Sequence, residues 1–495
     1  MKTSKSSVSR RSFITSVSGA LAGITILPSQ VIAGLGHPAP SDKLNIAGIG
    51  VGGMGYRNLK NMELQNIVAL CDVDANYANR NSFREWPLAP RYSDFRVMFE
   101  RQRDIDAVVI ATPDHTHALP AVMAMRQGIH VYLQQPLAHS VFESRILAET
   151  AKRYGVATQM GNQGNSDDGI RDICEWIWAG KIGEVTRVDA WTKRPTWPQA
   201  LERPEKEMRV PRGLDWDLFI GPAKMRPYNE LYHPGNWRGW WDFGSGALGD
   251  MGSQILDPVF KALKLESPES VQASSTEFTI DSAPKAETIC FEFPARDNLP
   301  KVAMPPLVVN WFDGGLMPNR PDELKDGERM GDAAGGCIFY GTKGKIICGS
   351  NASNPSLLPV SEMEHFQKPQ RTLRRIPDAI NGGHELDWIR ACKESRENRV
   401  EASSNFAYAG PLNEMLMLGT MAVRMQSLNR KLKWDGANMR FSNLSKSDYL
   451  HMPRKIRFET FTGDSGFNEQ YQEMPALAMA DEWTRHTYRK GWEQI

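Results

Sequence analysis

A short run of glycines constrains the fold of this chain more than any other feature of the sequence. Residues 44–48 are apolar and strand-like, and residues 54–63 have a helical pattern. Between them Gly48, Gly50 and Gly53 stand in the spacing G-x-G-x-x-G. We expect Gly48 to make the turn, Gly50 to let the backbone approach a pyrophosphate, and Gly53 to allow close packing of the helix on the strand. The N-terminus of the helix would then face the phosphates of a bound dinucleotide.

An acidic residue follows at the place where such a loop uses one. Residues 67–71 form a second apolar strand, and Asp72 comes directly after it, about 20 residues beyond the glycines. A carboxylate in this place accepts hydrogen bonds from the adenosine ribose and repels the 2′-phosphate of NADP. The sequence therefore predicts NAD as the cofactor in preference to NADP. The alternative is a glycine turn that binds no cofactor. The strand before the glycines, the helix after them and Asp72 all stand where a dinucleotide site needs them, which weighs against this alternative.

Apolar and helical segments keep alternating after Asp72. The strand-like segments are 106–111, 129–133 and 156–160, and the helical ones are 117–127 and 139–153. Continuous apolar strands separated by helices are typical of a parallel sheet that is covered on both faces. We therefore expect an α/β domain, a Rossmann dinucleotide-binding domain, over residues 43–165.

The pattern changes after this first domain. A helix at 169–179 leads into a strand at 185–193 and then into a stretch rich in proline and tryptophan. Five further segments alternate with period two between turn signals: 271–280, 286–294, 306–313, 336–341 and 344–349. These strands predict an α+β domain over residues 166–435, built on a large, mainly antiparallel open sheet, which carries the substrate site and any oligomer contact.

Two further features are expected near the C-terminus. A helix at 412–427 carries apolar residues at helical spacing, including Leu412 and Leu416. We interpret this stripe as core, and not as a binding surface. Residues 436–495 are expected to form a C-terminal extension that packs back on the body.

Residues 1–33 are typical of an export signal. A polar stretch with the pair Arg10-Arg11 precedes a weakly apolar run and a small-residue cleavage site that ends at Ala33. The apolar run is too short to span a membrane. We therefore predict export by the twin-arginine route into the periplasm, with residues 34–42 as a linker. An ordinary secretory signal with two chance arginines is the alternative.

Composition excludes several classes of protein. The chain has 495 residues, of which 41% are hydrophobic and 24% are charged, and its formal net charge is +1. It is long enough for two domains with separate cores, and this composition excludes a disordered or fibrous protein. A near-neutral body offers no electrostatic footprint for nucleic acid. The six cysteines include no Cys-x-x-Cys pair, so we expect no metal site.

Two of the cysteines flank a predicted hairpin. Thr342 and Lys343 separate two strand-like segments, so a two-residue turn places Cys337 directly opposite Cys348. Counted outward from the turn, the two cysteines form a hydrogen-bonded pair, where a disulfide bridge is harder to form. We therefore predict free thiols.

Further motifs carry a resemblance to a known family. They are ATPDHTH at 111–117, GIHVYLQQPLA at 128–138, MGNQ at 160–163, NWRGWWD at 236–242 and GALGDMG at 246–252. Together with the glycine loop they resemble the Gfo/Idh/MocA oxidoreductases over nearly the whole chain beyond the signal. The resemblance implies a nicotinamide in the cleft between a Rossmann domain and an open antiparallel sheet. It implies that Thr112, Pro113, His117 and Gln135 lie beside that cofactor.

The resemblance also indicates where catalysis would occur. In that family a lysine of Glu-Lys-Pro contacts the reacting hydroxyl, and the Asp and His of an Asp-x-x-x-His pattern act on the substrate proton. Here Gln135 takes the place of the lysine, Asp250 that of the aspartate and Gln254 that of the histidine. A glutamine takes up no proton near neutral pH. Asp250 is therefore left as the acid–base group, and the two glutamines would orient a sugar hydroxyl.

Histidines are further candidates for the proton chemistry. His233 lies just before the aromatic segment 236–242 and is the first choice by position. His115 and His117 follow a strand end near the expected nicotinamide, where capping of the next helix is an equal alternative. His384 precedes another helix and ranks last of the four.

Aromatic residues indicate the substrate class. Most of the 14 tryptophans fall between positions 176 and 241. Flat rings with polar edges suit the C–H faces of pyranose rings, so we predict that Trp237, Trp240 and Trp241 bind a sugar together with Arg238. The alternative is that several tryptophans are core residues.

Three functions remain open at this point. The first is an NAD-dependent dehydrogenase that oxidises a ring carbinol of a sugar or glycoside and releases a keto-sugar. The second is a redox-neutral reaction in which the hydride leaves and returns within one cycle on a retained cofactor, which export favours because no soluble nicotinamide pool is expected outside the cytoplasm. The third is a sugar-binding protein that has lost catalysis, which the two glutamines favour.

The expected partner is a small sugar or glycoside. We expect neither nucleic acid nor a membrane anchor, and a homo-oligomer through the sheet of the second domain stays open.

Overall fold

A computed structural model describes residues 42–297, 299, 301–460 and 465–493. The predicted signal peptide and nearly all of the predicted linker lie outside the described residues. By its contacts the chain separates into residues 1–43 and 44–495. Every element described below belongs to the second of these units.

A six-stranded parallel sheet forms the N-terminal half of this unit. Its strands are β1 (Asn45–Ile49), β2 (Asn66–Cys71), β3 (Arg91–Tyr92), β4 (Ala107–Ile110), β5 (His130–Gln134) and β6 (Thr158–Gly161), in the order β3-β2-β1-β4-β5-β6. The helices packed on it are α3 (Gly53–Asn61), α6 (Phe95–Arg101), α7 (Ala118–Arg126), α8 (Val141–Tyr154) and α13 (His384–Lys393). The expected Rossmann architecture is confirmed, and the short edge strand β3 was not predicted.

The two faces of this sheet are buried by helices from different parts of the chain. Val108 and Ile110 of β4 belong to the buried cluster that includes α6, α7 and α8. Ala107 and Val109 alternate with them and belong to a second cluster, where α3 packs together with Trp388 of α13. The continuous apolar strand pattern thus has its expected cause, which is burial on both faces.

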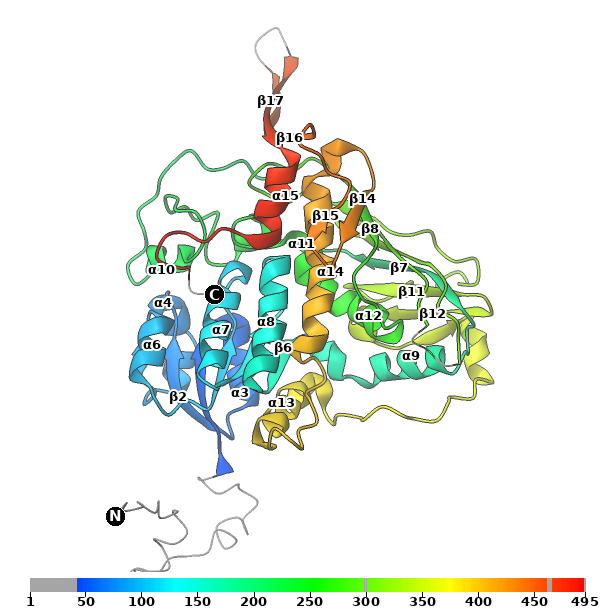
Figure 1. Ribbon diagram of the computed structural model, residues 1–495, viewed down its shortest axis with the longest axis horizontal. Coiled ribbons are helices and arrows are strands. Elements are labelled where there is room, and N and C mark those ends of the chain that lie inside the picture. Colours follow the sequence, from blue (N-terminus) through cyan, green and yellow to red (C-terminus); the bar gives the residue numbers. More distant parts are fainter. Residues whose placement is uncertain (1–41, 298, 300, 461–464, 494–495) are drawn as a thin grey trace, which may run out of the picture. The chain divides into compact units, whose positions relative to one another are not determined.

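A nine-stranded sheet forms the second half (Figure 1). Its strands are β7 (Val185–Thr192), β8 (Ser270–Ser275), β9 (Glu287–Phe293), β10 (Leu307–Phe312), β11 (Gly335–Gly341), β12 (Gly344–Gly349), β13 (Ser356–Leu358), β14 (Leu432–Asp435) and β15 (Arg440–Phe441). The order is β13-β12-β11-β7-β10-β9-β8-β14-β15, and all pairs are antiparallel except β7 with β10. Buried and half-buried residues alternate along β9 and β10, so one face is turned toward the core.

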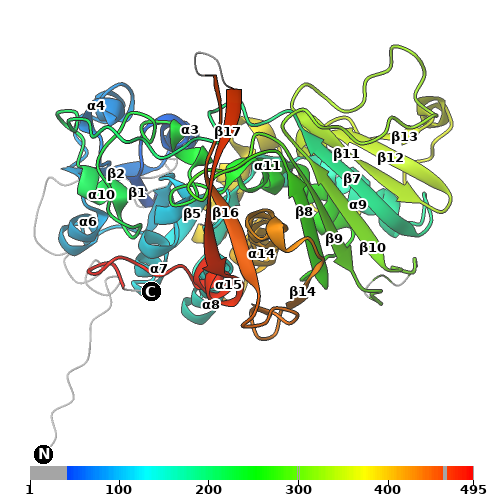
Figure 2. The same ribbon diagram turned by 90° about the horizontal axis from the view of Figure 1, so that it is seen from above.

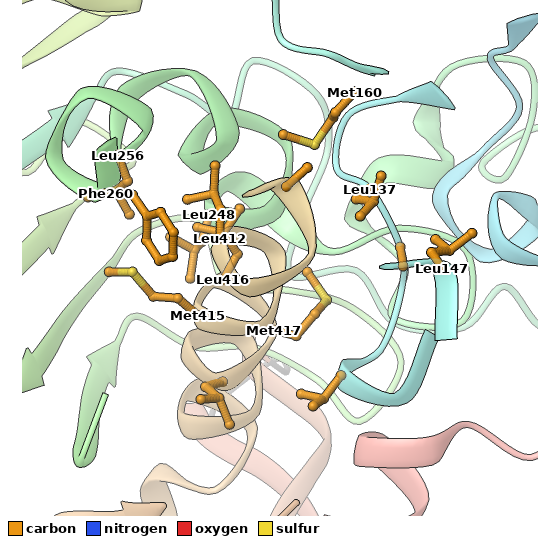
Figure 3. Close-up of a cluster of buried hydrophobic side chains, with 14 of the residues drawn as sticks. Leu137, Leu147, Met160, Leu248, Leu256, Phe260, Leu412, Met415, Leu416 and Met417 are labelled. Carbon is orange, nitrogen blue, oxygen red and sulfur yellow. The ribbon is translucent and has the colours of Figure 1, made fainter. Parts of the chain in front are cut away.

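A long helix, α14 (Phe406–Arg424), joins the two halves. Its first turn is capped by Asn405, whose side chain accepts a hydrogen bond from the backbone N–H of Ala407. It packs against α8 on one side and against β8 and β9 on the other (Figure 2). Figure 3 shows Leu412, Leu416 and neighbouring side chains of α14 between the two halves. The prediction that this helix is core is confirmed, since nearly all of its residues are buried.

The C-terminal segment contains elements that the sequence did not indicate. Strands β16 (Tyr449–Thr460) and β17 (Ser465–Pro475) pair only with each other, as a long hairpin. Helix α15 (Ala476–Arg485) follows and packs against α8. Near the chain end, Trp492 is buried and lies 6.2 Å from the ring of Phe95. The contacts of this segment thus reach the first domain.

The hairpin of β11 and β12 has the predicted register. Gly341 pairs with Gly344 across the two-residue turn, and Cys337 lies opposite Cys348. Both thiols are free and buried, and that of Cys337 donates a hydrogen bond to the carbonyl oxygen of Ile255 at 2.8 Å. The prediction of free thiols is confirmed. Within the described residues no helix has the length and apolar character that a membrane span requires.

Candidate functional site

A pocket opens at the carboxyl ends of β1, β2, β4 and β5. Its far wall comes from the segment 233–238 and from helix α11 (Gly246–Ile255) of the second half. Ten of the residues predicted for the site line it: Gly50, Gly53, Asp72, Thr112, Pro113, Gln135, His233, Trp237, Arg238 and Asp250. The carboxyl edge of a parallel sheet is where open α/β folds bind their ligands.

The glycine loop owes its shape to close backbone approaches. Gly50 has a φ of +73°, and a Cβ there would lie 2.7 Å from the backbone of Ala111. A Cβ at Gly48 would lie 2.8 Å from Leu59 of α3, and one at Gly55 would overlap the carbonyl oxygen of Gly50. Close packing of helix on strand therefore depends on Gly48 and Gly55.

The role predicted for Gly53 is thus corrected. A Cβ at Gly53 would meet only the hydroxyl of Tyr77, at 3.3 Å, so no strand lies close to it. Its φ of +43° is the feature that favours glycine. The same Tyr77 ring covers Gly52.

Asp72 ties the end of β2 to the glycine loop. Its carboxylate accepts a hydrogen bond from the backbone N–H of Val51 at 2.9 Å and another from that of Asp74 at 2.9 Å. Burial raises the pKa of Asp72 to about 6, while the hydrogen bonds from the backbone oppose this. Asp74 in turn caps the short helix α4 (Ala75–Ala78) by accepting from Asn76 and Tyr77. A carboxylate has about four lone-pair positions, so Asp72 can still accept a hydrogen bond from a ribose hydroxyl.

The residues present fit a nicotinamide dinucleotide. The hydroxyl oxygen of Thr112 and the amide oxygen of Gln135 are buried and find no hydrogen-bond partner among the described residues. Both residues line the pocket. Buried polar atoms without partners are rare in native proteins and indicate an absent ligand or water. The N-terminus of α3 behind Gly50 supplies the free backbone N–H groups that phosphates need.

His117 does not face the pocket. Its Nδ1 lies 2.8 Å from the carbonyl oxygen of Pro136 and its Nε2 lies 2.8 Å from that of Thr112. The ring is buried and absent from the pocket lining. His117 thus links the loop after β4 to the loop after β5, and its predicted contact with the cofactor is not supported.

Asp250 lies on α11 with an arginine beside it. Nε of Arg238 donates a hydrogen bond to Oδ1 of Asp250 at 3.2 Å, and the guanidinium stacks 4.4 Å from the ring centre of Trp237. Burial raises the pKa of Asp250, while the charge of Arg238 opposes the rise. Gln254 follows one turn later on α11 but does not line the pocket. Of the four residues predicted to be catalytic, Asp250, Gln135 and His233 therefore line the pocket and Gln254 does not.

Asp114 is a second acid that the sequence reasoning missed. It is buried behind the pocket, and its carboxylate accepts a hydrogen bond of 2.6 Å from Ser245, the residue before α11. Burial raises the pKa of Asp114 to about 7, and the charge of Asp250 adds to the rise. The segment ATPDHTH was recognised only as a motif. The position of Asp114 between the end of a predicted strand and a predicted helix could have indicated it as a site residue.

His233 contacts a different part of the site from Asp250. Its Nε2 lies 3.5 Å from the carboxylate of Asp74, just after β2. Burial lowers the pKa of His233, while Asp74 opposes the shift. Gln135 follows β5, three strands away from β2 in the sheet, which corresponds to roughly 14 Å. His233 therefore lies beside Asp74 at the β2 end of the pocket, and its contacts do not support its predicted catalytic role.

The other two histidines are buried among backbone groups. His115 lies with Nε2 3.0 Å from the carbonyl oxygen of Phe219 and Nδ1 3.2 Å from that of Phe243. His384 contacts the carbonyl oxygen of Met160 at 2.8 Å and the hydroxyl of Ser166 at 2.6 Å. Neither lines the pocket. Both rings thus contact distant segments, and His115 does not cap the helix that follows it, which was the alternative proposed for it.

Two of the three predicted sugar-binding tryptophans are core residues. Trp240 is fully buried against Tyr232, and its indole N–H donates to the carbonyl oxygen of Leu231 at 2.8 Å. Trp241 is buried as well, with its N–H on the carbonyl oxygen of Thr279 at 3.3 Å. Neither of these two residues lines the pocket, so the prediction that they bind a sugar there is wrong; Trp237 and Arg238 of the preceding 3₁₀ turn do line it.

The fold and the site together define a two-domain dinucleotide-binding protein with a separate substrate domain. Residues 44–162 match the family described as "Oxidoreductase family, NAD-binding Rossmann fold", and residues 174–295 match "Oxidoreductase family, C-terminal alpha/beta domain". Both matches support the Gfo/Idh/MocA family. The first domain is thus an NAD-binding Rossmann domain, as the glycine loop and Asp72 predict.

Curated relatives match over part of their length. The chain is 28% identical over 148 residues to 2,7-anhydro-N-acetylneuraminate hydratase of Mediterraneibacter gnavus, covering 29% of this chain and 38% of the relative. It is 26% identical over 160 residues to scyllo-inositol 2-dehydrogenase (NAD(+)) of Bacillus subtilis, covering 32% and 47%. It is 32% identical over 173 residues to an alpha-N-acetylgalactosaminidase of Bacteroides fragilis, covering 33% and 40%. Each match thus spans less than half of the relative.

Solved structures share the fold over a longer range. Levoglucosan dehydrogenase in complex with NADH superposes with a TM-score of 0.54 at 17% identity, covering 79% of this chain and 99% of that one. The WlbA dehydrogenase from Bordetella pertussis in complex with NADH and UDP-GlcNAcA gives 0.53 at 16% identity, covering 79% and 99%. At this identity the likeness shows the two-domain fold.

Proposed function

We propose that this protein is an NAD-dependent oxidoreductase that acts on a sugar or glycoside by hydride transfer at a ring carbinol, within a redox-neutral cycle on a retained cofactor. One observation carries the proposal. A half-buried carboxyl, Asp250, shares a pocket with the glycine loop of the NAD-binding domain. Oxidation of a carbinol needs a base, because the hydroxyl proton must leave when the hydride is transferred.

The first domain supplies the groups that hold the cofactor. Gly50 and the N-terminus of α3 would hold the pyrophosphate, and Asp72 the adenosine ribose. The unpaired oxygens of Thr112 and Gln135 would bind the nicotinamide end or a substrate hydroxyl. Bound NAD supplies a hydride acceptor in this pocket.

The second domain supplies the acid–base group. Asp250 accepts the hydroxyl proton of the substrate and returns it later in the cycle. Its raised pKa brings it closer to neutral pH, where a general base works best. Arg238 bonds to Asp250 and lies over Trp237, so it fixes the carboxylate and presents its remaining N–H donors to sugar hydroxyls.

Two considerations support a redox-neutral cycle over a net oxidation. The predicted export would separate the protein from the cytoplasmic nicotinamide pool. Moreover, two of the relatives are named as a hydratase and a galactosaminidase, and both names describe reactions without net oxidation.

The predicted export is tested with the double variant Arg10→Lys, Arg11→Lys. Undiminished export of this variant would contradict the twin-arginine route.

The decisive experiment uses protein purified natively, without added cofactor. Mass spectrometry should detect one retained NAD per chain. Incubation with glycosides deuterated at single ring carbons should then give many turnovers, with the deuterium returned to the product. Turnover that stops at one equivalent until NAD is added would identify a net dehydrogenase instead.

A second candidate function is a sugar-binding protein that has lost catalysis. The amides at Gln135 and Gln254 favour it, because neither transfers a proton. Saturable sugar binding without turnover in the parent, together with turnover in a Gln135→Lys, Gln254→His double variant, would support this alternative.

A further inference from the structure

A second pocket lies apart from the NAD pocket and shares none of its lining residues. It has a volume of about 580 Å³, within the usual range for small-molecule sites. Its wall is formed by the end of α14, by α15, by the described parts of the β16–β17 hairpin and by residues of the segment 202–205. Figure 1 shows α15 in red beside the orange α14.

An arginine without a polar partner lines this pocket. Arg424, on the last turn of α14, lies with its guanidinium 3.8 Å from the ring centre of Trp483 and 5.2 Å from that of Trp241. Its Nε is buried without a hydrogen-bond partner, and no ion pair joins Arg424 to another described residue. Burial lowers the pKa of Arg424 to about 9, and Glu482 and Asp281 oppose this only from a distance. The two indole rings hold the guanidinium plane in place while leaving its N–H donors unused.

Three of the five carboxylates that line the pocket already have a cationic partner. Asp281 pairs with Arg203, and Asp242 pairs with Arg226. Glu482 lies 3.8 Å from Lys224 and accepts a hydrogen bond from Thr487 at 2.6 Å. Asp281 and Glu482 therefore act on Arg424 only from a distance.

We propose that this pocket binds a small molecule that carries an oxyanion, and that Arg424 is the residue that binds the anionic group. A buried charge without a counterion destabilises the fold, so a pocket built around one is stabilised by an anion. A guanidinium offers parallel N–H donors that match a carboxylate, sulfate or phosphate in bidentate geometry. The volume exceeds that of a bare ion, so the anion is part of a larger molecule such as an acidic sugar.

The test compares binding to the full-length protein by calorimetry. The probes are glucuronate, glucose 6-sulfate and glucose 6-phosphate, with glucose as the neutral control. We expect saturable binding of at least one charged probe and at least tenfold weaker binding by Arg424→Met, which keeps the length of the side chain between the tryptophans. The charged probe that binds most tightly identifies the source of the oxyanion.

A matched control separates binding from a general loss of charge. Arg187 stacks 3.9 Å from the ring centre of Tyr340 on the second sheet, and it pairs with Asp189 outside the pocket. Arg187→Met should bind the probes like the parent. If no charged probe binds more tightly than glucose, or if Arg424→Met and Arg187→Met bind alike, the proposal is overturned.

Thermal unfolding distinguishes a binding role from a purely structural one. If Arg424 serves the anion, Arg424→Met should unfold at or above the midpoint of the parent in probe-free buffer, and the bound probe should raise the midpoint of the parent alone. A lower midpoint of Arg424→Met, with equal probe-induced shifts in both proteins, would assign Arg424 to packing and overturn the proposal.

Discussion

At the scale of single residues, two carboxyls meet at the first half of α11, that of the half-buried Asp250 and that of the buried Asp114. Asp250 faces the pocket, and Asp114 lies behind it on Ser245. The charge of Asp250 raises the pKa of Asp114, because two like charges share a region of low polarity. Asp114 thus responds to the ionisation of the proposed general base.

The variant Asp250→Asn tests the proposed base. An amide takes up no proton, so we expect kcat to fall by roughly two to four orders of magnitude, while the retained NAD stays unchanged. Gln135→Ala is the matched comparison, since it removes one neutral hydrogen bond from the same pocket. It should cost about 0.5–1.5 kcal/mol, mainly in KM. Full activity of Asp250→Asn would place the proton chemistry elsewhere.

Asp114 should make stability depend on pH. Its pKa rises from the ordinary value of 3.8 to about 7 in the folded chain, so the folded state holds the proton more tightly. The stability from this group is therefore present below about pH 4 and is lost as the pH rises through about 7. Asp114→Asn still accepts from Ser245 but cannot ionise. At pH 8 it should be more stable than the parent by at most about 4 kcal/mol, and near pH 4 the two should be alike.

Urea unfolding of both proteins at pH 4.5 and pH 8 measures this difference. Parallel pH profiles for parent and variant would show that Asp114 is not protonated near neutral pH in the folded chain.

At the scale of elements, the turn between β1 and α3 requires glycine for two different reasons. Gly50 lies too close to neighbouring backbone to carry a side chain, and Gly53 has a left-handed backbone conformation. Gly50→Val places a branched side chain against the backbone of Ala111, at a φ of +73°. We expect loss of NAD binding together with a lower melting temperature. Gly53→Ala meets only the hydroxyl of Tyr77 at 3.3 Å and should cost about 1–2 kcal/mol for its left-handed backbone, with NAD retained.

Native mass spectrometry and thermal unfolding of the two glycine variants provide the measurement. Equal NAD retention by Gly50→Val and the parent would mean that the loop is structural only.

At the scale of the whole molecule, α14 packs between the two halves, so that both sheets share one hydrophobic core. Leu416 is fully buried against α11, in a hydrophobic cluster that includes residues from both halves (Figure 3). We therefore expect residues 44–495 to unfold in one cooperative transition. Leu416→Ala should lower the free energy of unfolding by about 2–5 kcal/mol and shift that single transition as a whole. Calorimetry that resolves two transitions, of which only one moves, would show that the domains unfold separately.

The sequence by itself determined the elements whose signals are local. The strand–glycine–helix unit, the alternation up to β6, the period-two strands of the second sheet and the register of Cys337 with Cys348 all follow from spacing within short windows. The NAD-binding class follows for the same reason, since its loop and its acid lie close together in the chain.

Only the tertiary structure decided which side chains meet across long separations. The cover of the first sheet by α13, the pairing of His233 with Asp74, and the burial of Trp240 and Trp241 each join segments whose approach depends on the packing of the whole unit. The same holds for Arg424, which is an ordinary last-turn arginine of α14 in the sequence and a half-buried charge without an ion-pair partner among the described residues in the fold. Local periodicity fixes which face of an element is apolar, but burial and partner are properties of the packed molecule.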